Sequence, residues 1–324
     1  MKERELKCSV CGNSNSNREY ILQEKMYGSG DEFNYFQCSK CGCLQIEKIP
    51  ETIAEYYPTD YMAFSINEKL NFKKKISAWL LIHSYRNQIN QRDFVGKLAK
   101  KYNDYYQRAI LWAKDSNFNS KVLDVGCGVG KRLLLMHKIG YKNLEGIDPF
   151  IQNDIVYYDK IHIKKGDIYD LNGKYDFITL HHSFEHMPNP RNAFQKISGL
   201  LSDEGTLLIR IPVMDCFAWK EYGVNWFQLD APRHFFLHTI NSIEFLTKLN
   251  NLVLTDVVFD STESQFVYSE KYKNNIPLDG KSIHSKEEIK NFHNKALELN
   301  ESKEGDMACF FIKKNKLPNL IGDM

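Results

Sequence analysis

One glycine-rich segment, Val122–Gly130 (VLDVGCGVG), constrains the fold of this chain more than any other part of its sequence. It begins as a short apolar run typical of a buried strand, and the following residues, Lys131–Ile139, have the character of a helix. Glycines at 126, 128 and 130 let the backbone approach a ligand closely, and the start of a helix offers free N–H groups. The segment therefore predicts a strand–turn–helix unit that binds a ligand.

The alternation of strand and helix continues along the chain. The expected strands, besides Lys121–Gly126, are Asn143–Pro149, Lys160–Asp167, Tyr175–Ser183, Gly205–Pro212, Leu252–Ser261 and Met307–Asn315, and further helices are expected over Asn192–Leu201 and Thr239–Asn250. Strands separated by helices predict right-handed crossovers and an α/β fold with a parallel sheet covered on both faces. Ligands of such sheets bind beyond the carboxyl ends of the strands.

Acidic residues lie at or near the ends of successive expected strands. Asp124 precedes the first glycine by two residues, and Asp148 and Asp167 end the next two expected strands. Asp148 is placed to accept hydrogen bonds from a ribose diol, and Asp167 could reach an adenine amino group with Ile168 beside the ring. Turn formation explains any single aspartate, but it explains the series poorly. The spacing G-x-G-x-G, in place of G-x-G-x-x-G, disfavours a dinucleotide-dependent oxidoreductase.

The motifs DVGCGVG, GIDP, GDI and HHSFEHMPNP, in this order, resemble those of class I S-adenosylmethionine-dependent methyltransferases, most strongly over residues 120–212. The resemblance implies an enzyme with a Rossmann-like, seven-stranded, mostly parallel sheet whose last strand runs antiparallel. It implies S-adenosylmethionine as the cofactor, with His181 and His182 close to the sulfonium. The cofactor-binding residues that it implies are Asp124, Gly126, Cys127, Gly128, Gly130, Asp148, Pro149, Asp167, Ile168 and His181.

Candidate acceptor-side residues follow the fourth and fifth expected strands of the sheet. Methyl transfer is an in-line displacement that needs alignment and often a base for an acceptor hydroxyl. An aromatic segment at residues 226–238 adds two further histidines, His234 and His238, together with Arg233, which suits a phosphate or carboxylate. The candidate catalytic residues are His182, Glu185, His186 and His234. A divalent cation on His182, Glu185 and Asp230 is an alternative that no clear acidic pair supports.

Five of the eight cysteines lie in the first 43 residues, four of them in two C-x-x-C-G motifs. Four thiolates suit tetrahedral zinc, and the glycine after each motif relieves a tight turn. The predicted zinc ligands are Cys8, Cys11, Cys38 and Cys41, with Cys43 as a spare or as a competitor for Cys41. A head of this size cannot build its own apolar core, so a structural zinc ion would supply most of its stability.

The sequence predicts three segments. A zinc-binding head covers residues 1–48, and a linker and helical segment covers residues 49–119. The linker starts with an extended Tyr/Pro-rich stretch, Ile49–Phe64, before a helical pattern over Asn67–Lys114. The methyltransferase domain covers residues 120–324. It includes a mostly irregular insertion at about 262–306, with one helix near Ser285–Asn300.

Charge limits the partners of the chain. Its 43 Lys and Arg against 41 Asp and Glu give a net charge of +2, which makes nucleic acid an unlikely ligand. The stretch Lys69–Lys101 nevertheless carries +8. It is either a solvated helical face or a surface for an anionic membrane or a phosphorylated substrate. The chain shows no secretory signal and no run of about 20 apolar residues, so we expect a cytoplasmic protein.

The order of the two C-x-x-C-G motifs, YYPTDY and the methyltransferase motifs resembles bacterial enzymes of surface-polysaccharide and deoxysugar pathways. This resemblance implies a sugar, a nucleotide-linked sugar or a sugar-linked group as the acceptor, with O-methylation as the first expectation. C- or N-methylation of a deoxysugar remains open. Two further alternatives also remain open. The substrate could be RNA or protein that the head recognises, or the chain could be a non-catalytic scaffold that binds S-adenosylmethionine.

Overall fold

The computed structural model describes residues 6–57, 79–80, 82–87, 89, 94–99 and 115–316. Most of the basic stretch Lys69–Lys101, and with it most of the helical pattern predicted over Asn67–Lys114, lies outside these residues. Within it, α2 spans Phe94–Ala99. No helix in the described part of the chain combines the length and the apolar character needed to cross a membrane.

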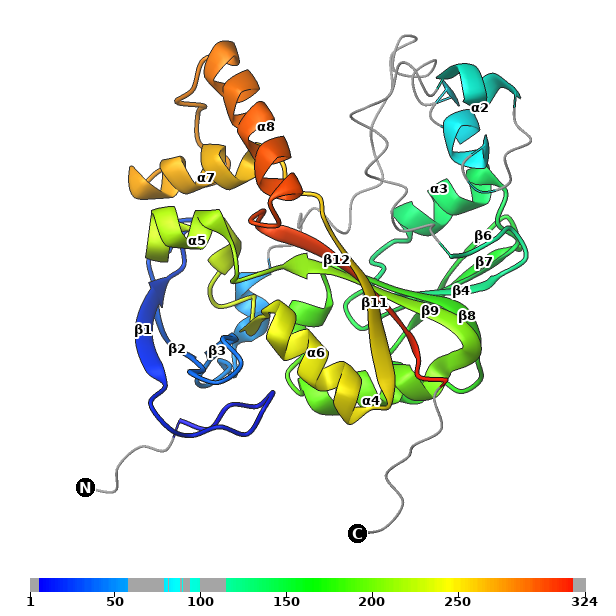
Figure 1. Ribbon diagram of the computed structural model, residues 1–324, viewed down its shortest axis with the longest axis horizontal. Coiled ribbons are helices and arrows are strands. Elements are labelled where there is room, and N and C mark those ends of the chain that lie inside the picture. Colours follow the sequence, from blue (N-terminus) through cyan, green and yellow to red (C-terminus); the bar gives the residue numbers. More distant parts are fainter. Residues whose placement is uncertain are drawn as a thin grey trace. The chain divides into compact units, whose positions relative to one another are not determined.

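A mostly parallel sheet carries the glycine-rich segment, as predicted. Its strands are β4 (Lys121–Val125), β5 (Asn143–Asp148), β6 (Ile155–Tyr157), β7 (Ile161–Lys165), β8 (Tyr175–His181), β9 (Leu201–Pro212), β11 (Leu252–Phe259) and β12 (Met307–Lys314). Their order is β11-β12-β9-β8-β4-β5-β7-β6 (Figure 1). β4 pairs in parallel with β5 and with β8, and β5 pairs in parallel with β7. The carboxyl ends of these four strands therefore share one edge of the sheet.

Within the described part of the chain the sheet has eight strands, so the expected number of seven is wrong. The additional strand is β6, which pairs antiparallel with β7 and places Val156 opposite His162. Tyr158 and Asp159, with φ of 57° and 52°, let the chain reverse between the two strands. A strand of three residues is too short to show an alternating pattern, which is why the sequence did not reveal it.

The helices expected beside the sheet are present, and others appear in addition. Their bounds are α3 (Lys131–Ile139), α4 (Pro190–Leu200), α5 (Phe217–Tyr222), α6 (Ile240–Leu249), α7 (Ser264–Lys273) and α8 (Lys286–Glu301). α6 begins at a capping box, in which Thr239 Oγ1 accepts from the Ser242 amide at 3.0 Å and Ser242 Oγ accepts from the Thr239 amide at 2.9 Å. This pair of hydrogen bonds fixes the start of the predicted helix.

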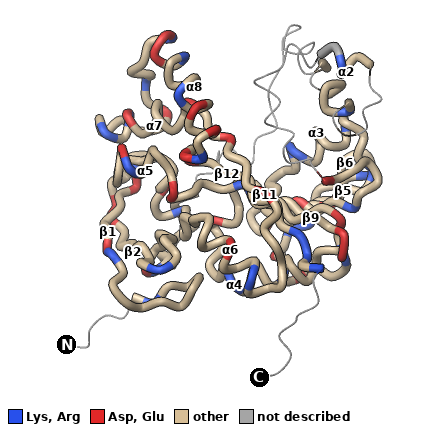
Figure 2. The backbone as a smooth tube through the Cα atoms, viewed as in Figure 1, with Lys and Arg blue, Asp and Glu red and all other residues tan. Residues whose placement is uncertain are grey.

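The segment at 262–306 is largely helical, so the expectation of a mostly irregular insertion is wrong. It holds α7 and α8, and α8 carries both acidic and basic residues (Figure 2). Phe266, Ala296 and Leu299 form a buried apolar cluster against which Phe217 and Phe292 pack. In α8 these apolar residues recur every three or four positions, which gives the helix one face to bury.

A second sheet surrounds the cysteine motifs. It consists of β1 (Arg18–Gln23), β2 (Glu32–Gln37), β3 (Leu44–Ile46) and β10 (Phe236–Leu237), in that order. β10 comes from the aromatic segment far along the chain and pairs antiparallel with β3, which places Leu237 opposite Leu44. The sheet of the head is therefore completed by residues that sequence reasoning assigned to the acceptor side.

The described part of the Tyr/Pro-rich stretch is not wholly extended, contrary to expectation. A 3-10 turn, η1 (Ile53–Tyr56), is closed by hydrogen bonds from the Ile53 amide to the Pro50 carbonyl (3.2 Å) and from the Tyr57 amide to the Ala54 carbonyl (3.1 Å). A proline restricts the residue before it, so the residues that follow Pro50 are free to turn.

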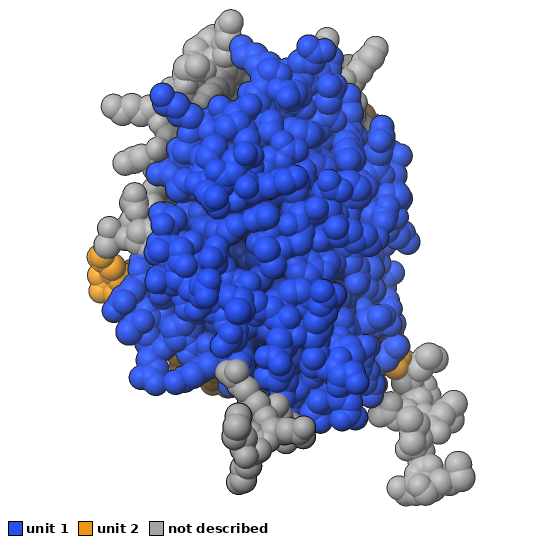
Figure 3. Space-filling model, turned by 90° about the vertical axis from the view of Figure 1, so that its left-hand side faces the viewer, with its two compact units in different colours: residues 1–57, 182–195, 210–310 blue, residues 58–181, 196–209, 311–324 orange. Residues whose placement is uncertain are grey.

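The chain forms two compact units (Figure 3). The first comprises Met1–Tyr57, His182–Gln195 and Arg210–Phe310, and the second comprises Pro58–His181, Lys196–Ile209 and Phe311–Met324. These units differ from the three consecutive segments expected from the sequence. The pairing of β3 with β10 accounts for part of the difference, because it joins the head to the aromatic segment far along the chain.

Candidate cofactor and acceptor sites

The glycine-rich turn lies between β4 and α3 in the second unit. Gly130 is the N-cap of α3 and has a φ of 77°, a conformation that favours glycine. A Cβ at this position would lie 2.3 Å from Ile163 Cδ1. The turn therefore needs glycine at this position both for its backbone conformation and for its close approach to β7.

Asp148, the last residue of β5, is buried and fastens this turn. Its Oδ2 accepts the Gly128 amide hydrogen at 2.8 Å, and its Oδ1 accepts that of Phe150 at 2.8 Å. A carboxylate has about four lone-pair positions, so these two bonds leave it able to accept further hydrogen bonds from hydroxyl groups.

The other predicted cofactor residues lie on neighbouring strands. Thr179 Oγ1 on β8 donates to Asp124 Oδ1 at 2.7 Å, and burial raises the pKa of Asp124. Asp167 is exposed and accepts the Tyr169 amide hydrogen at 3.3 Å, whereas Ile168 is buried. Gly126, Pro149 and His181 follow or end β4, β5 and β8. The sheet thus brings the predicted cofactor residues to one edge.

Cys127 lies inside the turn. Burial raises the pKa of its thiol, so the thiol stays protonated near neutral pH. A protonated thiol is a poor nucleophile, in agreement with the view that Cys127 is a small residue of the turn rather than a catalytic group.

His182 follows the end of β8 directly and belongs to the first unit. Its backbone has a φ of 52°, and its amide donates to the Arg210 carbonyl at 3.0 Å. Its Nε2 lies 2.6 Å from Arg210 Nη1. A guanidinium only donates, so Nε2 accepts and a neutral ring carries its proton on Nδ1. That Nδ1 lies 3.5 Å from Glu185 Oε1.

Glu185 lies in a 3-10 turn, η6 (Phe184–His186), and is fully buried. Among the described residues, neither of its carboxylate oxygens accepts a hydrogen bond of standard geometry. Burial by itself would raise the pKa of Glu185, but His182, His186 and His234 nearby outweigh it and lower that pKa to about 2. The carboxyl group is therefore ionised at neutral pH.

His186 and His234 complete the predicted acceptor-side set. The Nδ1 atom of His186 lies 2.7 Å from the Arg233 carbonyl, and that of His234 lies 2.7 Å from the Gln228 carbonyl. The two rings meet edge to face with centroids 4.9 Å apart, and His234 Nε2 lies 4.0 Å from Glu185 Oε1. The first unit thus gathers all four candidate catalytic residues.

Arg233 does not serve as an exposed anion site, contrary to expectation. Its guanidinium is fully buried and donates to Asp230 Oδ1 (2.6 and 3.0 Å), to Glu24 Oε1 (2.8 Å) and to the Tyr56 carbonyl (3.0 Å). Arg233 is therefore the centre of a buried ion-pair cluster, to which the head contributes Glu24 and the turn η1 contributes a carbonyl. Burial by itself would lower the pKa of Arg233, but the two carboxylates raise it.

Sequence reasoning missed Arg210 and Asp260. Arg210 Nε donates to Asp260 Oδ2 at 2.7 Å, and this ion pair holds the guanidinium against His182. Arg210 is the single charged residue in the apolar run GTLLIRIP, and that isolation was the available signal. Nothing in the sequence pattern of Asp260 distinguishes it from an ordinary residue at the end of a strand.

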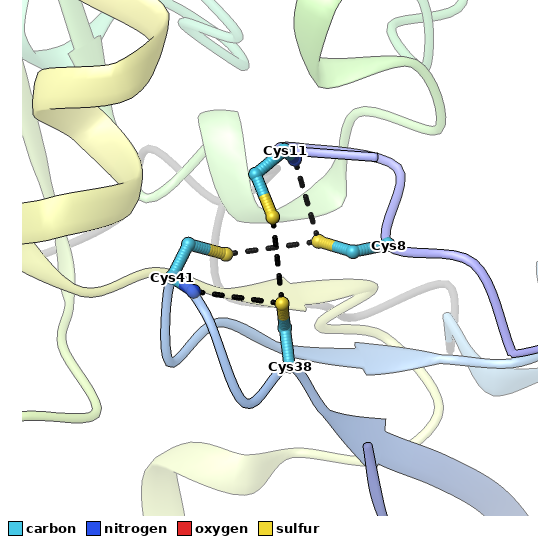
Figure 4. Close-up of side chains that lie close together, drawn as sticks. All are labelled: Cys8, Cys11, Cys38 and Cys41. Carbon is cyan, nitrogen blue, oxygen red and sulfur yellow. Dashed lines mark hydrogen bonds between the residues drawn. The ribbon is translucent and has the colours of Figure 1, made fainter. Parts of the chain in front are cut away.

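The four predicted zinc ligands meet in one cluster (Figure 4). The Sγ atoms of Cys8 and Cys41 lie 3.6 Å apart, and those of Cys11 and Cys38 lie 3.4 Å apart. Tetrahedral zinc with Zn–S bonds of about 2.3 Å needs sulfur atoms about 3.8 Å apart, so the cluster can hold this ion. Cys43 is a separate buried thiol that faces the Leu44 carbonyl.

Comparison with known proteins identifies the family to which the chain belongs. A family model described as a methyltransferase domain matches residues 94–257, which is half of the chain. The chain therefore belongs to this methyltransferase domain family. It is an enzyme that depends on S-adenosylmethionine and transfers a methyl group, as the sequence motifs predicted.

Solved structures show weaker similarity. The O-methyltransferase of a trans-AT polyketide synthase from Brevibacillus brevis, in complex with S-adenosyl-L-homocysteine, is 17% identical, with 71% of this chain and 79% of that chain covered and a TM-score of 0.41. A putative sarcosine dimethylglycine methyltransferase from Galdieria sulphuraria is 18% identical, with 70% and 91% covered and a TM-score of 0.43. No curated protein matches the chain in sequence.

Proposed function

We propose that this enzyme transfers the methyl group of S-adenosylmethionine to a hydroxyl oxygen of a sugar, a nucleotide-linked sugar or a sugar-linked group in surface-glycan biosynthesis. One observation carries the proposal. The loop that leaves β8 carries His182, Glu185 and His186, and the aromatic segment adds His234, so that three imidazoles lie around the buried carboxylate of Glu185. A hydroxyl acceptor must lose a proton during methyl transfer, and imidazole is the side chain best suited to take it at neutral pH.

The second unit would hold the cofactor through its glycine-rich turn. Asp148 would accept hydrogen bonds from the ribose hydroxyls, since its two backbone bonds leave lone pairs available. Asp167 and Ile168 would contact the adenine. Asp124, Gly126, Cys127, Gly128 and Gly130 would surround the methionine and ribose portion, with Pro149 beside the ribose and His181 near the sulfonium.

His182 is the residue that we assign as the base. When bound, S-adenosylmethionine would supply an electrophilic methyl group for in-line transfer to the acceptor oxygen, with S-adenosylhomocysteine as the leaving group. His182 would take the hydroxyl proton at Nε2, which now accepts from Arg210, so the acceptor hydroxyl would replace Arg210 at this atom. Glu185 would hold the opposite nitrogen, Nδ1, and stabilise the imidazolium that forms.

We propose a structural zinc ion for the four-cysteine cluster. Two backbone amides, those of Cys11 and Cys41, lie 3.5 Å from the sulfur atoms of Cys8 and Cys38, an arrangement that favours thiolates. Four protein thiolates leave no open coordination position, so this ion would have no part in methyl transfer. The ion would stabilise the head against the aromatic segment that carries β10.

The deciding experiment supplies S-adenosylmethionine with an isotopically labelled methyl group and a panel of nucleotide sugars. We expect formation of S-adenosylhomocysteine and one labelled methyl per sugar, with NMR placing it on oxygen. A methyl on carbon or nitrogen would overturn the O-transfer assignment. Transfer only to RNA or protein would overturn the sugar acceptor. Cofactor binding with no turnover on any acceptor of these classes would overturn the proposed activity as a whole.

A further inference from the structure

Glu185, His186 and His234 form a second cluster of metal-ligating side chains, apart from the cysteines. One ligand atom from each lies within 4.8 Å of the other two. Glu185 is fully buried, His234 is nearly so, and the carboxylate oxygens of Glu185 accept no standard hydrogen bond among the described residues. A carboxylate that is buried without such hydrogen bonds is a ligand that a bound cation would satisfy.

Both histidines are held in the tautomer that metal binding requires. His186 and His234 each place Nδ1 2.7 Å from a backbone carbonyl, which can only accept a hydrogen bond. Nδ1 therefore carries the proton in each ring, and the lone pair lies on Nε2. A backbone carbonyl that fixes the far nitrogen is the usual support of a metal-bound histidine.

Two carboxylates lie beside the Nε2 lone pair of His234. The Nε2 atom of His234 lies 4.0 Å from Glu185 Oε1 and 3.8 Å from Asp230 Oδ2. Asp230 already binds Arg233 through Oδ1, which leaves Oδ2 facing the imidazole. The Phe235 amide donates to the Glu185 carbonyl at 2.9 Å, so the two segments that carry these ligands are tied together at the backbone.

The charges of the buried groups also favour a cation. Glu24 and Asp230 both bind the Arg233 guanidinium, and Glu185 lies beyond them next to the imidazoles. Among the described residues, Glu185 pairs with the imidazoles of His182 and His234, at 3.5 and 4.0 Å. A divalent cation would give this carboxylate a closer positive partner at the point where the ligand atoms converge.

We propose that His186 Nε2, His234 Nε2 and a carboxylate oxygen of Glu185 bind a first-row divalent transition-metal ion, with Asp230 Oδ2 as the nearest further ligand. Imidazole with carboxylate suits zinc, iron or cobalt in the divalent state, in contrast to the four thiolates of the head. Bonds of about 2.1 Å place tetrahedral ligands about 3.4 Å apart, so the ligand atoms, which lie within 4.8 Å of one another, would close in by up to about 1.4 Å on binding.

This inference deepens the proposed function, and any role of the ion in methyl transfer rests on that proposal. In this inference Glu185, His186 and His234 bind the metal ion, and His182 remains the base. The inference itself concerns metal binding, which is measured without an acceptor. Its failure would leave the methyl-transfer proposal standing, and loss of the methyl-transfer proposal would leave the metal measurement unchanged.

The experiment uses Co²⁺ as the probe. The folded chain is washed with a chelator weak enough to leave one zinc per chain in the head, as elemental analysis would verify, and Co²⁺ is then titrated. We expect one further equivalent with ligand-field absorption and no thiolate-to-cobalt charge transfer. We expect Glu185→Gln and His234→Asn each to weaken Co²⁺ binding at least tenfold. His293→Asn, which removes a histidine paired with Glu263 at 3.0 Å, should bind as the unchanged chain does.

Several results would overturn the proposal. One is that the unchanged chain takes up no further Co²⁺. Another is that the Glu185 and His234 variants bind Co²⁺ as tightly as the unchanged chain. A thiolate charge-transfer band would show that Co²⁺ had entered the cysteine cluster. Retention of one zinc per chain in each variant shows that its head is folded. His186→Asn gives an independent third variant if either of the others loses this zinc.

Discussion

The Asp148 carboxylate accepts the amide hydrogen of Gly128 at 2.8 Å, so the acid expected to bind the ribose also fixes the glycine-rich turn. The turn and the acid come from different strands, β4 and β5, which pair in parallel. This arrangement orders the turn before a ligand arrives. Preorganisation of this kind increases affinity, because less conformational freedom is lost on binding.

Replacing Asp148 should therefore weaken cofactor binding through two effects. Asp148→Asn removes the charge that favours hydrogen bonds from the ribose hydroxyls, and it replaces one of the two acceptor oxygens with an amino group. Charge-assisted hydrogen bonds contribute about 1.5–3 kcal/mol, so we expect the Kd for S-adenosylhomocysteine to rise by about tenfold to a hundredfold. Calorimetry measures it. Asp176→Asn is the matched control, since Asp176 accepts the Lys121 amide hydrogen at the amino end of the strands. An equal effect of both variants would contradict the assignment.

Gly130 tests the geometry of the turn. Gly130→Ala places a Cβ against Ile163 and puts alanine at a positive φ, which costs about 1–2 kcal/mol before the clash is counted. We expect a lower melting temperature and weaker binding of S-adenosylhomocysteine. Adding Ile163→Val removes the clashing Cδ1 atom and should recover part of the loss. Gly199→Ala, at an open position within α4, should be neutral or stabilising. No recovery in the double variant would argue against the close contact.

His182 tests the assignment of the base. His182→Asn should lower kcat by about 10²-fold to 10⁴-fold, the usual contribution of a general base, and leave the Kd for S-adenosylhomocysteine within about twofold. Steady-state kinetics and calorimetry measure the two quantities. His293→Asn should change neither. A normal kcat in the His182 variant would exclude it as the base and shift attention to the remaining imidazoles.

The cysteine cluster and Cys43 should respond differently to substitution. Cys11→Ser should lose the zinc of the head and lower the melting temperature, since the metal contributes directly to folding. Cys43→Ala should keep this zinc and lose only packing, about 1–2 kcal/mol for a buried thiol. Elemental analysis and thermal unfolding measure both. If the Cys43 variant lost zinc, Cys43 rather than Cys41 would be a ligand.

Asp306 should make stability depend on pH. Burial raises the pKa of Asp306 to about 6 from 3.8, although Trp226 Nε1 donates to it at 3.2 Å. An acid with a raised folded pKa favours its protonated form, so stability falls as pH rises between about 4 and 6. Between pH 5 and 8 this loss is about 1 kcal/mol. Asp306→Asn should remove it, so that its stability relative to the unchanged chain rises from pH 5 to pH 8 in urea unfolding. A constant difference between the two chains would contradict the shifted pKa.

Much of the fold could be read from local pattern. The expected segment Lys131–Ile139 coincides with α3, and the run at Lys121–Gly126 became β4, because periodicity and glycine placement are local properties of the chain. The failures share a cause. β6 has only three residues, and α7, unlike the expected helix near Ser285–Asn300 that is present as α8, becomes evident only when Phe266 and Leu299 bury each other. Short elements and mutual burial leave little local signal.

The sequence by itself determined the chemistry of each site. Glycine spacing indicated the cofactor turn, and the doubled C-x-x-C-G motif indicated the four-cysteine cluster, since both depend on residues close together in the chain. Only the tertiary structure decided which distant groups meet. It buried Arg233 between Asp230 and Glu24, placed Arg210 on His182, and brought His234 beside Glu185. Such contacts follow from packing between remote segments, and local sequence pattern carries no record of that packing.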